Sequence, residues 1–371
     1  MKHKVCYVTS TRDDYNPLKE TILALHNCKD IDFKLVVTGT HLSSKFGNTY
    51  KEIVKDGITK FDKVNIKLGD GSKKDMVLAV SDAIKKFTEY FTNYQPDLLV
   101  LCGDRFEIFA VATAASIMGI KIAHISGGDV TEGAIDDVFR NSITQMSSLH
   151  FPGNEDSKKR IIQMGKDSKT VHNVGEPGIE NILKVKKINK QELSKILNFD
   201  LTKDYAVVTY HPETLSKTSV KEDMKQLIKA IDKFNMNYLI TKSNADAGGL
   251  IINDIWEKES KKHNNWLFVS SLGVDTFINC LRNSKMIIGN SSSGILEAPT
   301  IGIPTVNIGN RQKGRMLAKS VINCKCNSED ITKVINKALK MNNKKNYLYG
   351  DGKTSSKIVK YILDYLNKWK I

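Results

Sequence analysis

The sequence lacks the features that would place the protein in a membrane or send it out of the cell. None of its 371 residues falls in an uncharged apolar run approaching the roughly 18 residues that a membrane-spanning helix needs. Residues 1–8 carry lysines and lead straight into a strand pattern, with no signal-peptide core. Apolar residues make up 40% of the chain and charged residues 26%, as in ordinary globular proteins. We therefore expect a cytoplasmic protein with no membrane partner.

Cysteine is also scarce, and its spacing excludes two common frameworks. The chain has six cysteines, and they show neither zinc-ligand spacing nor a disulfide pattern. Cys324 and Cys326 are two residues apart, but no histidine lies near them to complete a metal site. Cys6, Cys102 and Cys280 stand in apolar runs, where a reduced cysteine packs as a small core residue. We predict no bound metal.

Arginine is rare in a chain whose net charge is +15. Only seven of its 56 cationic residues are Arg, and the lysines are scattered over predicted solvated helix faces. The basic runs lack interleaved aromatic residues or a nucleic-acid-binding module, so we expect no nucleic-acid partner. Five of the seven arginines instead stand in segments rich in Gly, Asp and Ser, namely Arg12, Arg105, Arg140, Arg311 and Arg315. Guanidinium groups suit phosphate or carboxylate recognition.

Short apolar runs alternate with helical patterns along the whole chain. Strands are predicted near residues 4–9, 33–38, 97–101, 120–125, 149–152, 205–210, 237–242, 266–269, 285–288 and 304–308. The longest helical pattern runs over residues 76–91, and Gly and Pro within 173–180 mark a hinge. Such alternation predicts parallel sheets covered by helices, and the chain length favours two domains.

Polar residues follow several of these predicted strands directly. Asp104 and Arg105 come after one strand, and His124 and Asp129 stand at the end of another. A third strand ends before a serine run that precedes Glu297. In open α/β sheets, active sites form beyond the carboxyl ends of the strands. The pattern predicts an enzyme that acts on a phosphorylated ligand.

Longer motifs in the same order resemble the hydrolysing UDP-N-acetylglucosamine 2-epimerases. They lie at residues 11–15, 38–42, 210–214, 243–248 and 309–315. The resemblance implies an α/β fold of glycosyltransferase-B type, in which two Rossmann-like domains enclose the active site in an interdomain cleft. It places an N-terminal sugar-binding and catalytic domain at 1–175, a nucleotide-binding domain at 176–352, and a final helix at 353–371 that crosses back. It further implies a UDP-sugar substrate, UDP as product, no cofactor, and a homodimer or homotetramer.

A nucleotide site is expected in the second half of the chain. Ser291 and Ser292 offer hydroxyl donors at a strand-to-helix turn, and Arg311 can add a cation for a pyrophosphate. The resemblance implies that His211 contacts phosphate and that Glu297 accepts hydrogen bonds from the ribose. It adds three further nucleotide-binding residues, which are Arg12, Asn244 and Asp246. The alternatives are helix capping by the serines and an Asx turn at 244–246.

The catalytic residues are expected in the first half. In the family that the motifs resemble, UDP is eliminated across C1–C2 of the sugar and water adds to the resulting glycal, which yields free N-acetylmannosamine. The resemblance therefore implies, as the first expectation, the conversion of UDP-N-acetylglucosamine to N-acetylmannosamine and UDP for sialic acid biosynthesis. That chemistry needs a base for the C2 proton and a cation near the departing phosphate. Asp104, Asp136 and His124 resemble family positions for the acid–base work, with Arg105 beside the leaving group. Asp136 and its neighbour Asp137 would point about 100° apart on a helix, and we expect Asp136 to carry the function.

Some positions depart from the family pattern. Ser126 stands where non-hydrolysing relatives have a Glu, and Asp129 is one methylene shorter than the Glu often found after the two glycines. Asp129 is therefore a candidate to replace the missing Glu. Asn141 replaces a His after Arg140, and Asn16 with Pro17 replaces a Ser-Lys pair. These changes leave open a 2,4-diacetamido-2,4,6-trideoxyhexose on UDP or GDP, a glycosyltransferase, a non-hydrolysing epimerase or a binding protein.

Overall fold

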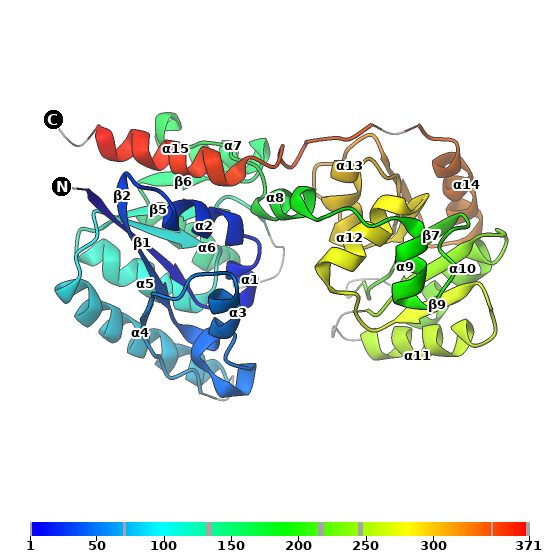
Figure 1. The fold of residues 1–371 in the computed structure, drawn as a ribbon, viewed down its shortest axis with the longest axis horizontal. Coiled ribbons are helices and arrows are strands. Elements are labelled where there is room, and N and C mark those ends of the chain that lie inside the picture. The colour runs from blue at the N-terminus through cyan, green and yellow to red at the C-terminus, as the bar shows by residue number, and fades with distance from the viewer. Residues whose placement is uncertain are drawn as a thin grey trace. The chain divides into compact units, whose positions relative to one another are not determined.

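The chain folds into two compact units in the computed structural model (Figure 1). The structure describes residues 2–69, 72–130, 136–213, 219–243, 248–342 and 344–368. Unit 1 comprises Met1–Asn181 and Tyr349–Ile371, and unit 2 comprises Ile182–Leu348. The chain therefore passes between the units twice.

Unit 1 contains a six-stranded parallel sheet in the order β3-β2-β1-β4-β5-β6. Its strands are β1 (His3–Thr9), β2 (Ile31–Val37), β3 (Asp62–Lys63), β4 (Leu98–Cys102), β5 (Lys121–Ile125) and β6 (Leu149–Phe151). This is the doubly wound order, in which the chain reverses its direction of travel between β1 and β4. The carboxyl ends of those two strands therefore flank the topological switch point of unit 1.

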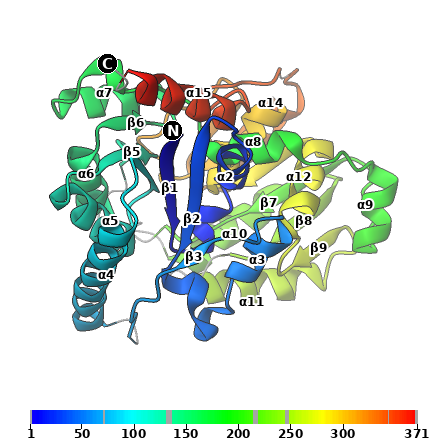
Figure 2. The ribbon, with the colours of Figure 1, turned by 60° about the vertical axis from the view of Figure 1, so that its left-hand side comes forward.

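Helices cover both faces of this sheet. They are α1 (Arg12–Tyr15), α2 (Lys19–His26), α3 (Tyr50–Lys55), α4 (Lys73–Asn93), α5 (Phe106–Ile117), α6 (Asp136–Met146), α7 (Glu155–Gln163), α8 (Pro177–Lys184) and α15 (Thr354–Asn367), with 3₁₀ turns at Gly39–Leu42, Ser44–Phe46 and Ser168–Thr170. Figure 2 shows α4, α5 and α6 on the opposite side of the sheet from α2. Several helices begin after a polar residue whose side chain accepts a backbone N–H, as Ser72 does for α4 and Asn154 for α7.

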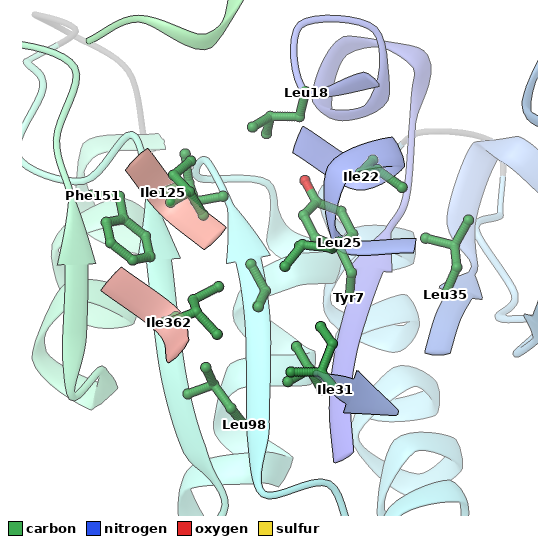
Figure 3. Close-up of a cluster of buried hydrophobic side chains, with 14 of the residues drawn as sticks. Tyr7, Leu18, Ile22, Leu25, Ile31, Leu35, Leu98, Ile125, Phe151 and Ile362 are labelled. Carbon is green, nitrogen blue, oxygen red and sulfur yellow. The ribbon is translucent and has the colours of Figure 1, made fainter. Parts of the chain in front are cut away.

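Alternation along the strands supplies both cores of unit 1. In β1, Val5 and Tyr7 face the core shared with α2 and α15, while Cys6 and Val8 face the core shared with α4 and α5. Figure 3 shows Tyr7 of the first core surrounded by side chains from α2 and the neighbouring strands. Both faces of the sheet are therefore buried, as continuous apolar strands require.

The C-terminal helix α15 belongs to unit 1. Ile358, Ile362 and Leu366 recur at four-residue spacing and lie in the core with α2 and the sheet, and Figure 3 shows Ile362 near Phe151. The start of α15 is held by Glu180, whose two carboxylate oxygens accept the backbone N–H and the hydroxyl of Ser355, each at 2.7 Å.

Unit 2 repeats the same strand order with different residues. Its strands are β7 (Tyr205–Thr209), β8 (Asn237–Thr241), β9 (Trp266–Val269), β10 (Met286–Gly289), β11 (Thr305–Ile308) and β12 (Val321–Cys324), arranged β12-β11-β10-β7-β8-β9 and parallel. Its helices are α9 (Lys190–Leu197), α10 (Val220–Ile231), α11 (Gly249–Ser260), α12 (Gly273–Asn283), α13 (Glu297–Ile301) and α14 (Ser328–Leu339), with a 3₁₀ turn at Ser292–Gly294. The switch point lies between β7 and β10.

The two six-stranded α/β units confirm the predicted fold class. Each predicted strand is present, and the structure adds the edge strands β3 and β12. No helix within the described ranges is long and apolar enough to span a membrane.

Candidate active site

Arg140 gathers the acidic residues that follow β4 and begin α6. Its side chain is nearly buried, and its Nη2 donates to Asp104 while its Nη1 donates to Asp137 at 2.5 Å. Nη1 also donates to the backbone carbonyl of Asp129 at 2.8 Å. One guanidinium thus joins the exit of β4, the segment after β5 and the first turn of α6. The sequence placed Arg140 within a motif but assigned it no role.

Opposing electrostatic effects act on the pKa of Asp104. Burial raises the pKa of Asp104, the charge and hydrogen bond of Arg140 lower it, and the nearby Asp136 and Asp137 raise it again, leaving it above its ordinary value. Its side chain is still about a quarter exposed, at 25%. Asp104 therefore combines access to solvent with a raised proton affinity, which suits acid–base work.

Asp136 and Asp137 occupy the first turn of α6, where their charges favour the helix dipole. Asp137 is tied to Arg140, as described above. Asp136 is partly exposed and contributes to the field at Asp104, and no described residue forms a hydrogen bond to it. The sequence-based choice of Asp136 over Asp137 remains a prediction that this geometry favours.

His124 is buried at the end of β5 with both ring nitrogens engaged. Its Nε2 lies 2.8 Å from the carbonyl of Gly103, so Nε2 carries the proton and donates. Its Nδ1 then accepts from the hydroxyl of Thr144, 3.1 Å away. Burial lowers the pKa of His124 to about 4. This geometry argues against His124 as the base that the sequence suggested, because neither nitrogen is available to a substrate proton.

Asp129 is anchored to the start of α7. Its Oδ1 accepts from the hydroxyl of Ser157 and, at 3.4 Å, from the side-chain amide of Asn154. Asn154 itself caps α7 by accepting the Ser157 N–H at 2.9 Å. One oxygen of Asp129 therefore fixes the segment after β5 to a helix, which is a structural part in addition to the catalytic part expected from the sequence.

Arg105 is paired before any ligand arrives. Its Nε and Nη2 donate to the two carboxylate oxygens of Glu107 at 3.1 and 3.0 Å. Burial by itself would lower the pKa of Arg105, but the Glu107 hydrogen bonds and charge raise it. The Glu107 side chain is fully buried, whereas that of Arg105 is 37% exposed. Arg105 thus presents a permanently charged, fixed guanidinium near Asp104.

The turn after β1 contains an acid that sequence analysis missed. Asp14 is buried and accepts from the hydroxyl of Ser10 at 2.7 Å, from its backbone N–H at 2.9 Å, and from the hydroxyl of Thr9. Burial raises the pKa of Asp14 to about 6, although these hydrogen bonds lower it. With Thr11 the residue forms a capping box for α1, and the Thr-x-x-Asp spacing was the available signal. Arg12, in the same turn, is exposed, and its Nη1 lies 3.8 Å from Oε1 of Glu52.

The position of the missing Glu has an unusual backbone. Ser126 follows β5 with a φ of 61°, the left-handed region that non-glycine residues rarely adopt. Its backbone N–H donates to the Phe151 carbonyl at 3.0 Å, which fixes the turn to β6. Strained backbone of this kind occurs often at functional sites.

The switch point of unit 2 is organised by Asn290, another residue that the sequence did not single out. Its side chain accepts the backbone N–H of His211 at 2.8 Å and donates to the carbonyl of His211 at 2.9 Å. Its carbonyl accepts from Arg311 at 3.2 Å and from Gln312 at 2.8 Å. Asn290 is fully buried. Asn290 therefore fixes three residues near this switch point, His211 through its side-chain amide and Arg311 and Gln312 through its backbone carbonyl.

A close approach of β7 and β10 brings Asn290 within hydrogen-bond distance of the His211 backbone. A Cβ on Gly289, whose φ is 137°, would lie 1.9 Å from the carbonyl oxygen of Thr209. Only glycine fits there. The imidazole of His211 lies beyond this contact, with Nδ1 3.3 Å from the hydroxyl of Ser243.

The serine turn combines capping with open donors. Ser291 accepts the backbone N–H of Ser293 at 3.3 Å, so the capping alternative holds for its oxygen. Its hydroxyl hydrogen and the partly exposed Ser292 in the following 3₁₀ turn are compatible with ligand binding. Both roles can therefore coexist at this turn.

Glu297, the first residue of α13, carries a buried carboxylate oxygen. Its Oε2 accepts no hydrogen bond from the described part of the chain. Burial raises the pKa of Glu297, while the charge of Arg315 lowers it in part. A buried acceptor without a donor is costly in a native protein, which points to a donor supplied by a ligand.

Two predicted nucleotide-binding residues, Asn244 and Asp246, lie outside the described residues. Within those that are described, no group of three or more His, Cys, Asp and Glu side chains is placed to hold a metal ion.

Comparison with known proteins identifies the family of the chain. The chain matches, over residues 23–363, the family described as UDP-N-acetylglucosamine 2-epimerase. It belongs to this family. The resemblance seen in the sequence is thereby confirmed, and the protein is an enzyme of the 2-epimerase kind.

Individual members of the 2-epimerase family cover nearly the whole chain. A GDP/UDP-N,N'-diacetylbacillosamine 2-epimerase (hydrolyzing) of Campylobacter jejuni is 39% identical over 333 residues, covering 89% of this chain and 86% of that protein. Polysialic acid biosynthesis protein P7 of Escherichia coli is 36% identical over 338 residues, covering 90% and 85%. The crystal structure of the 2-epimerase from Neisseria meningitidis bound to UDP-GlcNAc matches with a TM-score of 0.76 at 19% identity, covering 97% of this chain and 100% of that one. This last likeness shows the fold.

Proposed function

We propose that the protein is a hydrolysing 2-epimerase that releases UDP and a free 2-acetamido sugar with inverted configuration at C2. The observation that carries this proposal is the carboxylate cluster around Arg140, in which Asp104 has a raised pKa and Asp136 lies beside it. Removing a weakly acidic C2 proton needs such a base, and returning a proton to the other face needs a second acid. Asp104 follows β4, whereas Asp136 is the first residue of α6.

The reaction divides into two balanced steps. A carboxylate takes the C2 proton, the C–H electron pair forms a C1–C2 double bond, and the C1–O bond breaks with its electrons leaving on UDP. Water then adds its hydroxyl to C1 of the glycal and gives up its remaining proton to solvent, while the second carboxyl group delivers a proton to C2. The first carboxyl group then loses its proton to solvent and the second regains one, which restores the starting state. Asp104 and Asp136 are the proposed pair, and Arg105 is the cation proposed to stabilise charge on the departing phosphate.

The nucleotide is proposed to bind at the switch point of unit 2. Ser291, Ser292 and the cation of Arg311 would contact the diphosphate, with His211 beside them. The unpartnered oxygen of Glu297 would accept the ribose hydroxyls. Each of these groups lies beyond the carboxyl end of β7, β10 or β11, where doubly wound sheets bind their ligands.

For the sugar, we propose a UDP-linked 2,4-diacetamido-2,4,6-trideoxyhexose, with UDP-N-acetylglucosamine as the competing candidate. The Campylobacter jejuni relative, at 39% identity, is named for the diacetamido substrate. The departures at Ser126 and Asn141 lie on either side of Asp136 in the sequence and leave room for a sugar that differs from N-acetylglucosamine.

The decisive experiment incubates the enzyme with each UDP-sugar in deuterated water and analyses the products. Free sugar carrying deuterium at C2, together with UDP, is the expected result, with kcat/KM higher by about tenfold or more for the diacetamido substrate. In water labelled with heavy oxygen, the label should appear on the sugar rather than on UDP. Free sugar without deuterium would refute elimination, and a C2 epimer still attached to UDP would identify a non-hydrolysing enzyme.

A further inference from the structure

We propose that Arg140 is a positioning residue that holds Asp104 in place as the ionised member of the catalytic pair, an inference that rests on the function proposed above. Among the described residues, Arg140 donates hydrogen bonds to groups from three separate segments. Nη2 reaches Asp104 after β4, and Nη1 reaches both Asp137 on α6 and the Asp129 carbonyl after β5. No single segment could move without breaking one of them.

The guanidinium shape is essential to this arrangement. Two N–H groups on Nη1 serve two acceptors at 2.5 and 2.8 Å, and the adjacent Nη2 serves a third. A lysine ammonium is a compact point charge on a flexible stem, so it cannot reproduce the planar fork. The side chain is 7% exposed, which removes most competition from water.

The charges around Asp104 explain why a cation is needed there. Asp136 and Asp137 on α6 both repel a negative charge on Asp104, and Arg140 opposes them. Cys102 on β4 also lies within electrostatic range, and the buried His124 on β5 stays neutral. Arg105, the next residue along the chain, is paired with Glu107. Without Arg140, three carboxyl groups would share one site, and ionisation of Asp104 would require a higher pH.

The test measures UDP release as a function of pH with whichever UDP-sugar the wild-type enzyme hydrolyses. Arg140→Gln should lower kcat by about a hundredfold near neutral pH while KM stays within about threefold. The acidic limb of the kcat profile should move to higher pH, because Asp104 loses its cation. Arg140→Lys should keep the limb close to that of the wild type while kcat falls about tenfold, because the charge remains and the fork is lost.

Two further variants separate positioning from simple stabilisation. Asp137→Asn should move the acidic limb to lower pH, because it removes a charge that repels the Asp104 carboxylate and leaves Asp104 as the charged one of these two side-chain partners of Arg140. Arg160→Gln is the matched control. Arg160 donates to the Gly128 carbonyl at 2.7 Å close to the same segment, without a bond to Asp104. The Arg160→Gln variant should lower the melting temperature and leave the acidic limb of the kcat profile in place.

The outcomes distinguish this inference from the proposed function. A wild-type enzyme that releases neither UDP nor free sugar refutes the function itself. An active wild type whose acidic limb is the same in Arg140→Gln and Arg160→Gln overturns the role of Arg140. If Arg140→Gln does not fold, the other two variants test the proposal. It expects an acidic limb close to that of the wild type for Arg140→Lys and a limb at lower pH for Asp137→Asn, and an unmoved limb in Asp137→Asn contradicts it.

Discussion

Glu297 shows what a single residue contributes when its own fold leaves it incomplete. Its Oε2 is buried and receives no hydrogen bond from the described residues. Leaving such an acceptor without a donor costs about 1–3 kcal/mol. A ligand hydroxyl that supplies the donor recovers this free energy on binding, so the cost appears as selectivity for the ligand.

Glu297→Ala should therefore weaken UDP binding by about ten- to a hundredfold. The wild-type protein should also prefer UDP over its 2',3'-dideoxy analogue, and the variant should bind both alike. Titration calorimetry with the two nucleotides measures this directly. Asp200→Asn, in an exposed turn of the same unit, is the control and should leave both affinities unchanged. A variant that still discriminates between the nucleotides would remove Glu297 from the ribose site.

At this scale, sequence motifs pointed to candidate sites but not to the hydrogen-bond partners of each side chain. Asp104 follows β4 and His124 lies near the end of β5, both close to glycines, and no sequence pattern distinguishes their roles. The fold does so, because His124 is enclosed between Gly103 and Thr144 while Asp104 keeps a solvent-facing side. Asn290 was overlooked because its function lies in backbone contacts across two strands, which no local pattern records.

At the scale of elements, α15 is the clearest case of a distant segment that completes a core. Its residues are separated from β1 by most of the chain, yet Ile358 and Ile362 are fully buried with α2 and the sheet. The start of the helix is fixed by Glu180 through Ser355. Unit 1 therefore needs its C-terminal helix for its own stability.

Ile362→Ala should lower the free energy of unfolding by about 2–5 kcal/mol, because it removes a fully buried side chain and leaves a cavity. Val274→Ala on α12, where the side chain is exposed, should change it by less than about 0.5 kcal/mol. Urea unfolding of both variants provides the comparison. Equal effects would mean that α15 is not part of the cooperative core of unit 1.

The sequence predicted every central strand and missed two of the four edge strands, β3 and β12, for a physical reason that β3 illustrates. Central parallel strands such as β4 are buried on both faces and appear as apolar runs. The edge strand β3 consists of Asp62 and Lys63, with no apolar residue to mark it. Its pairing with β2 is decided by the tertiary fold.

At the scale of the whole molecule, buried imidazoles link stability to pH. Burial lowers the pKa of His41 and His124 to about 4 each, and that of His150 to about 3. Unfolded histidine titrates near about 6.5, so the unfolded chain binds more protons below that pH. Their contribution is fully present above about 6.5 and is lost as the pH falls toward about 4. Asp14, Asp104 and Glu297 act in the opposite sense, because burial raises the pKa of each carboxyl group. The pKa of His172 is lowered as well, so four imidazoles act together, and above about pH 5 their effect is the larger because unfolded histidine already gains protons from about pH 6.5 downward.

Stability should therefore fall between pH 7.5 and pH 5, seen as a lower urea midpoint at the acidic end. His150→Phe should make this dependence shallower, because it removes a buried imidazole whose nitrogens have no hydrogen-bond partner in the described structure. The exposed His26→Gln is the control and should not alter the slope. A midpoint that stays constant or rises on acidification would contradict the assignment of these histidines as buried and neutral.

The pair of hydrogen bonds between the Asn290 side chain and the backbone of His211 has a consequence for affinity. Loops that bind nucleotides usually lose conformational freedom when the ligand arrives, and that loss weakens binding. Here the exits of β7 and β10 are already joined, and the backbone N–H of Asn290 is itself bonded to Thr209. These loop amides should exchange their hydrogens with solvent as slowly as the strands they follow. The loops of the proposed nucleotide site are thus ordered before binding, because they lose their conformational entropy when the chain folds. A ligand bound there would cause little further loss.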